Sequence, residues 1–195
     1  MQEKNTNRFS VLMSGLGGQG LLTMGKVLAQ AGCSHYRYVT YHPNYGPSMR
    51  GGECECTVTL SNKENTSIAS RNPSAAILMG AGAWMLHEAQ VKPGGLLLVD
   101  SSIVAERTMR DDVTVHYMPA TQMALELGAA MVSNLILLGA YLEVTKALPL
   151  EAIEKALKDR FTGTKGERFL PIDLEAIRIG AEFITDSQTG GRHGT

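Results

Sequence analysis

The sequence predicts an α/β fold: a doubly wound, largely parallel sheet with helices on both faces and a helical C-terminal part. Three observations support this prediction. Short apolar runs alternate with segments of helical periodicity as far as residue 118. A glycine-rich turn joins the first apolar run to the first helical segment. After Pro119 the apolar pattern is helical throughout.

Six segments have the composition of β-strands. Residues 75–79 and 96–99 are apolar throughout, which is typical of buried strands. Residues 35–41 and 53–60 alternate between two kinds of side chain, which predicts strands with one wetter face. The predicted strands are residues 8–14, 35–41, 53–60, 75–79, 96–99 and 113–118.

Six further segments are predicted to be helical. The first has apolar side chains at helical spacing and ends near Gly32, a typical helix stop. The last begins with Asp173, a candidate N-cap, and places Ile177, Gly180 and Ile184 on one face. The predicted helices are residues 21–33, 84–90, 120–130, 134–145, 149–160 and 173–184.

The length of 195 residues suits one α/β domain with a helical appendage, and the 44% hydrophobic content suffices for its core. We expect this domain to span residues 8–186. Residues 187–195 have no apolar pattern, so a disordered tail is predicted there.

Composition disfavours several classes of partner. A formal net charge of -1 and 6% aromatic residues give no reason to expect nucleic acid or a membrane surface as a partner. The longest apolar stretches are too short to span a membrane, and the polar residues 1–8 lack a signal-peptide pattern. The three cysteines, Cys33, Cys54 and Cys56, form no Cys-x-x-Cys pair and are too few for an iron–sulfur cluster. We therefore expect buried free thiols, no metal site and a cytoplasmic location.

The glycine-rich turn spans residues 15–20, with the sequence Gly-Leu-Gly-Gly-Gln-Gly. Gly15 permits a tight turn, Gly17 brings bare backbone close to an anion, and Gly20 lets the helix pack against the strand. The free N–H groups at the helix start favour a phosphate or carboxylate.

Two interpretations of this turn remain: a nucleotide or coenzyme phosphate binds there, or the turn only lets helix and strand approach. No carboxylate ends the second predicted strand, and Gly20 is not followed by Lys-Ser/Thr, so a standard NAD or ATP site is disfavoured.

A second loop is predicted at residues 42–52, because two prolines and three glycines exclude a helix and a central strand. If adjacent strands run parallel, this loop and the glycine turn meet at the carboxyl edge of the sheet, where open α/β folds bind ligands. Arg50 then brings a guanidinium to the helix N-terminus, although a surface salt bridge is the alternative. The candidate site comprises Gly15, Gly17, Gly18, Gln19, Gly20, Tyr45, Gly46, Arg50 and Gly51.

Other reactive side chains offer weaker hypotheses. His42 is a candidate base, but a single histidine in a loop is more often simply exposed. Ser14, Ser48 and Ser133 lack the glycine elbow of a hydrolase nucleophile. Asp100 ends a strand and is expected to cap the segment that follows it.

Several motifs together resemble the gamma subunit of 2-oxoacid:ferredoxin oxidoreductases. The resemblance spans about residues 9–184 and is strongest in the paired glycine turn and second loop. The matching segments are residues 14–20, 44–52, 92–95, 99–102, 119–121 and the helix that Asn134 opens. The last helix begins with Asn in that family where this chain has Asp173, and we expect the cap to survive.

The resemblance implies a subunit that is inactive alone, in a hetero-oligomer that oxidatively decarboxylates a 2-oxoacid to an acyl-CoA and passes electrons to ferredoxin. The residues around 40–43 and 54–59 look most like the 2-oxoglutarate branch. Thiamine diphosphate and iron–sulfur clusters are then held by partner subunits, the thiamine- and ferredoxin-type chains. This chain binds no cofactor firmly, faces the co-substrate coenzyme A and is also expected to self-associate.

Two other classes of function stay open. A stand-alone Rossmann-type oxidoreductase would bind a nicotinamide or flavin by itself, and a purely architectural subunit would leave the glycine turn without a ligand. The apolar, small-residue helices and the loop at residues 42–52 are candidates for the surface that contacts other subunits.

Overall fold

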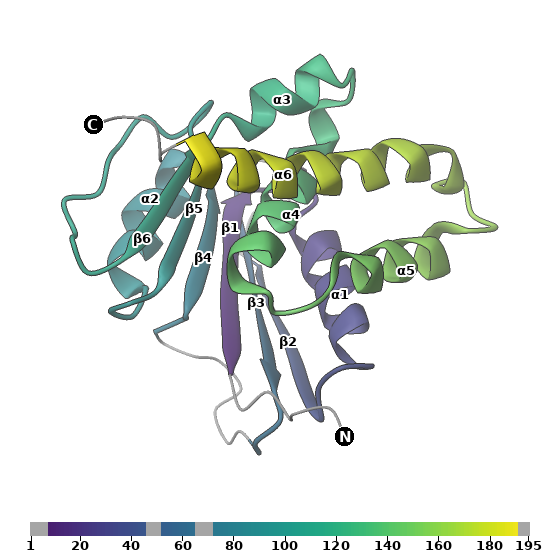
Figure 1. Cartoon of the computed structure of the whole chain (residues 1–195), viewed down its shortest axis with the longest axis horizontal. Helices are drawn as coiled ribbons and strands as arrows, with labels where there is room; N and C mark the ends of the chain where they lie inside the picture. Colours follow the sequence, from purple (N-terminus) through teal and green to yellow (C-terminus); the bar gives the residue numbers. More distant parts are fainter. Residues whose placement is uncertain (1–7, 46–51, 65–71, 191–195) are drawn as a thin grey trace.

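A computed structural model of the chain describes residues 8–45, 52–64 and 72–190 (Figure 1). The strands in this part are β1 (Phe9–Leu16), β2 (Tyr38–Tyr45), β3 (Glu53–Ser61), β4 (Ala75–Met79), β5 (Leu96–Asp100) and β6 (Thr114–Met118). They form one mixed sheet in the order β2-β3-β1-β4-β5-β6. β1, β4, β5 and β6 are parallel neighbours, whereas β3 runs antiparallel to β1 and β2. The predicted α/β class is confirmed.

The second predicted strand ends later and pairs differently than expected. β2 continues through Pro43 to Tyr45, in a stretch that was predicted to be loop. The reason is position: β2 is an edge strand, and an edge tolerates proline because one side needs no ladder partner. β2 and β3 form an antiparallel pair, so β2 is not a parallel neighbour of β1.

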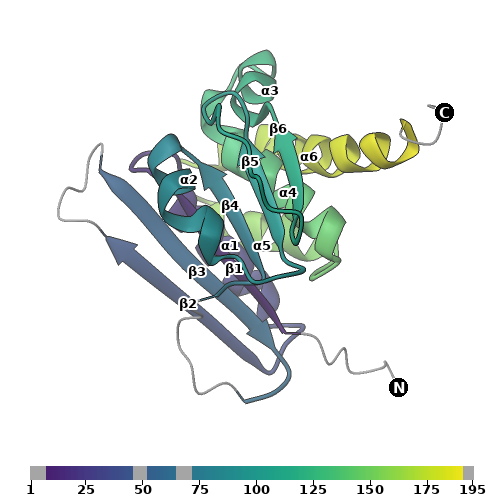
Figure 2. The same ribbon diagram turned by 90° about the vertical axis from the view of Figure 1, so that its left-hand side faces the viewer.

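Helices cover both faces of the sheet. They are α1 (Leu21–Gly32), α2 (Ala81–His87), α3 (Ala120–Glu126), α4 (Ser133–Thr145), α5 (Leu150–Phe161) and α6 (Leu170–Gly190), with short 3-10 turns η1 (Glu88–Gln90), η2 (Ala130–Val132) and η3 (Glu167–Phe169). In Figure 2, α2 lies on the near side of the sheet and α1, α4 and α5 lie behind it. Alternate residues of one strand therefore serve two cores: Ile77 packs with α1 and α4, and Leu78 packs with α2.

The central helix of the C-terminal part is buried all round. Every residue of α4 from Ser133 to Leu142 is buried. α6 crosses it closely: a Cβ on Gly139 would lie 2.0 Å from the carbonyl oxygen of Ile177, and one on Gly180 would lie 1.8 Å from that of Ile136. The small residues of α4 thus pack within the chain, so the hypothesis that this helix contacts other subunits is wrong.

The last helix begins earlier and ends later than predicted. α6 starts at Leu170, which places Asp173 inside the first turn rather than at the N-cap. The helix also continues to Gly190, so the predicted disordered tail is wrong for residues 187–190. Residues 191–195 lie outside the described part of the chain.

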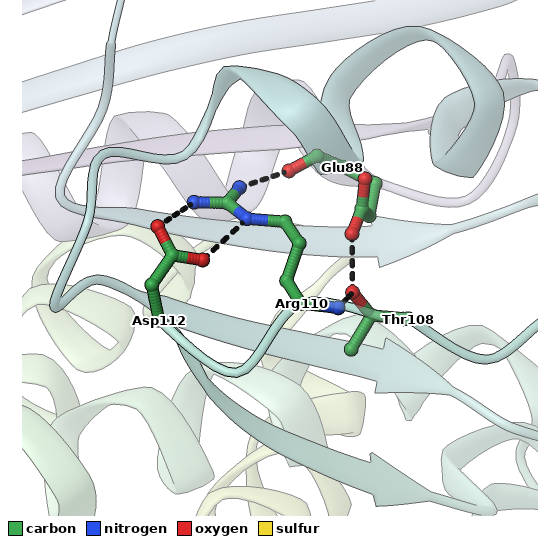
Figure 3. Close-up of polar contacts among 4 residues, drawn as sticks. All are labelled: Glu88, Thr108, Arg110 and Asp112. Atoms are coloured by element: carbon green, nitrogen blue, oxygen red, sulfur yellow. Dashed lines mark hydrogen bonds and ion pairs between the residues drawn. The ribbon is translucent and has the colours of Figure 1, made fainter.

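Hydrogen bonds from Arg110 stabilise the connection between β5 and β6 (Figure 3). Arg110 donates to both carboxylate oxygens of Asp112, at 2.8 and 2.9 Å, and to the carbonyl oxygen of Glu88 at 3.0 Å. The hydroxyl of Thr108 donates to the Glu88 carboxylate. The hydrogen bond from Arg110 holds the pKa of Asp112 below its usual range. The connection therefore has a defined path although it contains no helix or strand.

Candidate functional site

The glycine turn follows β1 and leads into α1, as predicted. Gly18 and Gly20 have φ values of 107° and 75°, in the left-handed region that favours glycine. Gly15 lies inside β1, and a Cβ there would come within 2.3 Å of Gln19 Oε1. Gly15 thus makes room for the Gln19 side chain.

Gln19 fastens the turn to the sheet. Its Oε1 accepts the N–H of Leu16 at 2.7 Å, and its Nε2 donates to the carbonyl oxygen of Met79 at 2.9 Å. The side chain therefore joins the carboxyl ends of β1 and β4. Because both polar atoms of its side chain form hydrogen bonds within the chain, Gln19 stabilises the turn in this structure.

The glycine turn meets the end of the second loop at one edge of the sheet. The N–H of Gly17 donates to the carbonyl oxygen of Gly52 at 2.9 Å. The strand register agrees, since Leu16 pairs with Glu53 and Tyr45 pairs with Cys54. The shared edge is confirmed, although it arises from the β2–β3 pair rather than from parallel neighbours.

This contact corrects the role expected for Gly17, because its N–H is already bonded and is not free for an anion. Gly46, Arg50 and Gly51 lie outside the described residues, and for Tyr45 only the backbone is described. Their part in a ligand site stays a prediction.

A cavity of about 220 Å³ opens beside the glycine turn. Its walls come from the N-terminal parts of α1, α4 and α6 and from the end of α5. The lining residues are Gly18, Gly20, Thr23, Met24, Val27, Met131, Asn134, Leu135, Leu157, Phe161, Gly166, Phe169 and Asp173. The turn thus contributes Gly18 and Gly20 to a site that is completed by the C-terminal helices.

Asn134 is the most buried polar side chain of this cavity, with 5% of its surface exposed. Its Oδ1 accepts the N–H of Leu135 at 2.8 Å, and its Nδ2 has no hydrogen-bond partner among the described residues. The amide lies against Gly20, where a Cβ would come within 2.5 Å of Nδ2. Gly20 is therefore needed for space as well as for its backbone conformation.

Asp173 is the one ionisable group among the described residues that line the cavity. Its carboxyl forms no hydrogen bond or ion pair with another described residue. Burial raises its pKa to about 6, because the surroundings disfavour the charged form. An N-cap carboxylate would instead be stabilised by helix N–H groups. The predicted cap is therefore wrong.

Most of the remaining candidate residues are buried. Asp100 is fully buried and accepts hydrogen bonds from the Ser102 N–H at 3.1 Å and from the Thr121 hydroxyl at 2.5 Å, so its predicted capping role is confirmed. His42 is exposed. Ser14 and Ser133 are both buried, and Ser48 lies outside the described residues.

Sequence reasoning missed a polar cluster on the α2 side of the sheet. Asn44 donates to Glu55 Oε1 at 2.7 Å, and His87 Nε2 lies 2.8 Å from Glu55 Oε2. The histidine ring is not aligned for a hydrogen bond, and both of its nitrogens are buried without one, so this pair is a close polar contact only. No sequence spacing indicated it, since the residues come from β2, β3 and α2.

The thiols and other metal-binding side chains are dispersed. Cys56 is buried, Cys54 is half-buried and Cys33 is exposed, and all three are free. The expectation of buried thiols is therefore wrong for Cys33, which lies just after α1. Within residues 8–45, 52–64 and 72–190, no three histidine, cysteine or acidic side chains are grouped so that they could hold a metal ion. No helix in this part of the chain is long and apolar enough to cross a membrane.

The family model described as pyruvate ferredoxin/flavodoxin oxidoreductase matches residues 10–183. The chain belongs to this family. Both the glycine turn and the cavity beside it lie within the matched residues.

Two relatives differ in how much of their length this chain covers. The ketoisovalerate oxidoreductase subunit VorA of Methanothermobacter marburgensis is 31% identical over 183 residues, which are 92% of this chain and 37% of VorA. The chain thus spans little more than a third of that relative. The 2-oxoglutarate synthase subunit KorC of the same organism is 29% identical over 188 residues, covering 93% of this chain and 99% of KorC.

Solved structures show the same fold. The gamma subunit of a keto/oxoacid ferredoxin oxidoreductase from Geobacter sulfurreducens superposes with a TM-score of 0.78 at 28% identity, covering 90% of this chain and 95% of that one. A 2-oxoglutarate:ferredoxin oxidoreductase from Magnetococcus marinus gives a TM-score of 0.82 at 22% identity, covering 91% of this chain and 31% of that one. The second likeness supports the fold alone.

Proposed function

We propose that this chain is a gamma-type subunit of a 2-oxoacid:ferredoxin oxidoreductase. The observation that carries the proposal is the match to KorC along 99% of its length, within a family model that covers residues 10–183. The net reaction is oxidative decarboxylation of a 2-oxoacid to its acyl-CoA, with ferredoxin as the electron acceptor. We propose 2-oxoglutarate as the substrate, following the KorC relatives, and the VorA relatives make 2-oxoisovalerate the main competitor.

In this proposal other subunits hold thiamine diphosphate and the iron–sulfur clusters, and this chain faces coenzyme A. The surface around the glycine turn supports a docking role, because it exposes large apolar side chains that water solvates poorly. Leu16 is 46% exposed and Met131 is 65% exposed. The free thiols support the proposed cytoplasmic location, since a reducing compartment keeps thiols unpaired.

Reconstitution tests the proposal. The chain is co-expressed with candidate thiamine- and ferredoxin-type subunits from the same organism, and the purified assembly is assayed for coenzyme A-dependent reduction of ferredoxin. We expect activity with 2-oxoglutarate that exceeds activity with pyruvate or 2-oxoisovalerate. An assembly without this chain is the control and should be inactive. Turnover of a 2-oxoacid by the chain alone, or its failure to co-purify with the other subunits, would refute the subunit assignment.

Two measurements distinguish this proposal from a stand-alone enzyme and from a purely architectural subunit. A stand-alone Rossmann-type enzyme would bind NAD(P)H tightly as an isolated chain, which fluorescence titration detects. A purely architectural subunit would tolerate Arg50→Ala with unchanged kinetics. We expect that variant to assemble normally and to show a higher KM for coenzyme A, because the guanidinium is proposed to face the coenzyme.

A further inference from the structure

A second cavity lies beside α2 and the β2–β3 pair. It measures about 220 Å³ and shares no described lining residue with the cavity beside the glycine turn. Most of its lining side chains are polar, and they come from β2, β3, the end of α2 and η1. The lining residues are Leu12, His42, Asn44, Glu55, Cys56, Thr57, Pro73, His87 and Gln90. The proposed function gives this polar cavity no role.

His87 is the buried polar side chain of this cavity. Its side chain is 9% exposed, and neither Nδ1 nor Nε2 has a hydrogen-bond partner among the described residues. Nε2 lies 2.8 Å from Glu55 Oε2, but the ring is not aligned to donate to that oxygen. Burial of polar atoms without a partner is unfavourable. A ligand that donates to both the imidazole and the carboxylate would satisfy the pair.

The polar wall of the cavity is rich in hydrogen-bond acceptors. Asn44 Nδ2 donates to Glu55 Oε1 at 2.7 Å, and Gln90 Nε2 donates to the carbonyl oxygen of Leu86 at 2.7 Å. The amide oxygens of Asn44 and Gln90 accept from no other described residue, and an ionised carboxylate can only accept. A ligand group with several N–H donors therefore matches this wall.

The charge of the lining favours a cation. Glu55 is acidic, and no lysine or arginine is among the described lining residues. A phosphate or carboxylate would therefore face Glu55 without a counter-ion. A metal ion is disfavoured, because the described part of the chain groups no three histidine, cysteine or acidic side chains that could hold one. An organic cation with N–H donors fits better than either.

The hydrogen bonds of Glu55 distinguish between two such cations. A guanidinium binds a carboxylate best through two parallel N–H bonds, one to each oxygen. Glu55 Oε1 already accepts from Asn44, so this bidentate arrangement is blocked. An ammonium group is a compact charge with three donors that can point in different directions. It can donate to Glu55 Oε2 and reach neighbouring acceptors as well.

We propose that this cavity binds a primary ammonium group, which donates to Glu55 Oε2, to a ring nitrogen of His87 and to the amide oxygen of Asn44. Leu12 and Pro73 supply apolar surface for the carbon atoms next to the ammonium. Two sources share this chemistry, a free small amine and a lysine side chain of a partner subunit. Only the lysine source rests on the proposed function.

Titration of the full chain with butylamine tests the site without other subunits. Butylamine carries the ammonium and the carbon stem of a lysine side chain, and butan-1-ol is the uncharged control of similar size. Heteronuclear NMR of the His87 ring reports binding in the cavity. We expect saturable shifts with butylamine, at least tenfold weaker binding of butan-1-ol, and weaker binding of propylguanidine than of butylamine.

Three variants locate the interaction. Glu55→Gln should weaken butylamine binding at least tenfold, and Asn44→Ala, at an exposed position, should weaken it about threefold. Glu53→Gln is the matched control, because Glu53 is exposed on the same strand and does not line the cavity, so affinity should be unchanged. Equal affinity for amine and alcohol, shifts that never saturate, or folded Glu55→Gln and Asn44→Ala variants that bind as wild type would each overturn the proposal.

Carbodiimide coupling of the assembled enzyme distinguishes the two sources, because it joins a carboxylate to an amine held beside it. A partner lysine in the cavity should give a cross-linked peptide that contains Glu55, detected by mass spectrometry. A free amine as the source should leave Glu55 without a cross-link and open to coupling with added butylamine. If the chain binds butylamine as expected but never assembles with other subunits, the proposed function fails and the ammonium site stands.

Discussion

The backbone N–H of Gly17 donates to the carbonyl oxygen of Gly52 at 2.9 Å. This bond joins the glycine turn to the start of β3, two segments more than thirty residues apart in the chain. It fixes the turn from the side of β3, while Gln19 fixes it from β4. The turn is therefore held on both flanks, and of its residues Gly18 and Gly20 line the cavity.

Gly20→Ala is expected to damage both the turn and the cavity. The new Cβ would lie 2.5 Å from Asn134 Nδ2 and would occupy a backbone conformation with φ of 75°. We expect a loss of roughly 2–3 kcal/mol in the free energy of unfolding, measured by urea denaturation. Gly18→Ala is the matched control, since a Cβ there meets open space, and backbone strain alone costs about 1–2 kcal/mol. Equal losses in the two variants would contradict the proposed contact with Asn134.

Asp173 should make stability depend on pH. Its pKa is raised in the folded chain, from 3.8 to about 6, so protonation favours folding. The free energy of unfolding should rise as pH falls from 8 to 4, by about 1 kcal/mol once solvent screening of this half-exposed group is allowed for. Asp173→Asn should be more stable than wild type at pH 8 and equal to it at pH 4.

Gly139→Ala should destabilise the packing of α4 against α6. A methyl group there would lie 2.0 Å from the carbonyl oxygen of Ile177, so the two backbones must separate. We expect a loss of ~3 kcal/mol in the free energy of unfolding, measured by chemical denaturation. Gly80→Ala serves as the control, because its Cβ would be in ordinary contact at 3.8 Å from Gly15 Cα. A Gly139→Ala variant as stable as Gly80→Ala would disprove the close crossing.

The thiols should react with a maleimide in order of exposure. Cys33 is exposed and should be labelled first. Cys56 is buried, and desolvation raises its pKa to about 12, so the reactive thiolate is scarce at neutral pH. Mass spectrometry of the native chain should show modification of Cys33 within minutes and of Cys56 only after unfolding. Early labelling of Cys56 would mean that β3 is open on the α1 side.

Arg110→Ala should loosen the connection between β5 and β6 without unfolding the domain. The variant loses the bonds to Asp112 and to the carbonyl oxygen of Glu88 shown in Figure 3. We expect faster trypsin cleavage at Arg107, with a melting temperature close to that of wild type. Arg160→Ala, at the end of α5, is a surface control that should leave the cleavage rate at Arg107 unchanged.

Sequence patterns predicted the class of the fold well because apolar periodicity is local. The buried strand β4 at Ala75–Met79 has the predicted bounds, and α1 differs by one residue. The prediction that Pro43 lies in a loop was wrong, because proline is tolerated in an edge strand. A sequence alone does not reveal which strand forms the edge of a sheet. The direction of β3 could not be predicted from local sequence patterns either. Its antiparallel pairing with β1 depends on contacts between segments that are distant in the chain.

The candidate site was predicted in part. The glycine turn and its edge of the sheet were located from the sequence, whereas the cavity was not. Asp173 looks like a helix cap in sequence, and only the earlier start of α6 at Leu170 shows that it lines a cavity. Asn134 was noted only through a family resemblance. The partnership of Gly20 with Asn134 depends on tertiary contact across more than one hundred residues, which no periodicity encodes.

The crossing of α4 and α6 has a consequence for the shape of the cavity beside the glycine turn. Asn134 lies five residues before Gly139 on α4, and Asp173 lies seven residues before Gly180 on α6. Because both polar groups are carried by helices whose separation is set at these two glycines, a larger residue at the crossing would widen the gap between amide and carboxyl. The width of the cavity is thus determined one or two helical turns away from its polar wall, by glycines that do not line it.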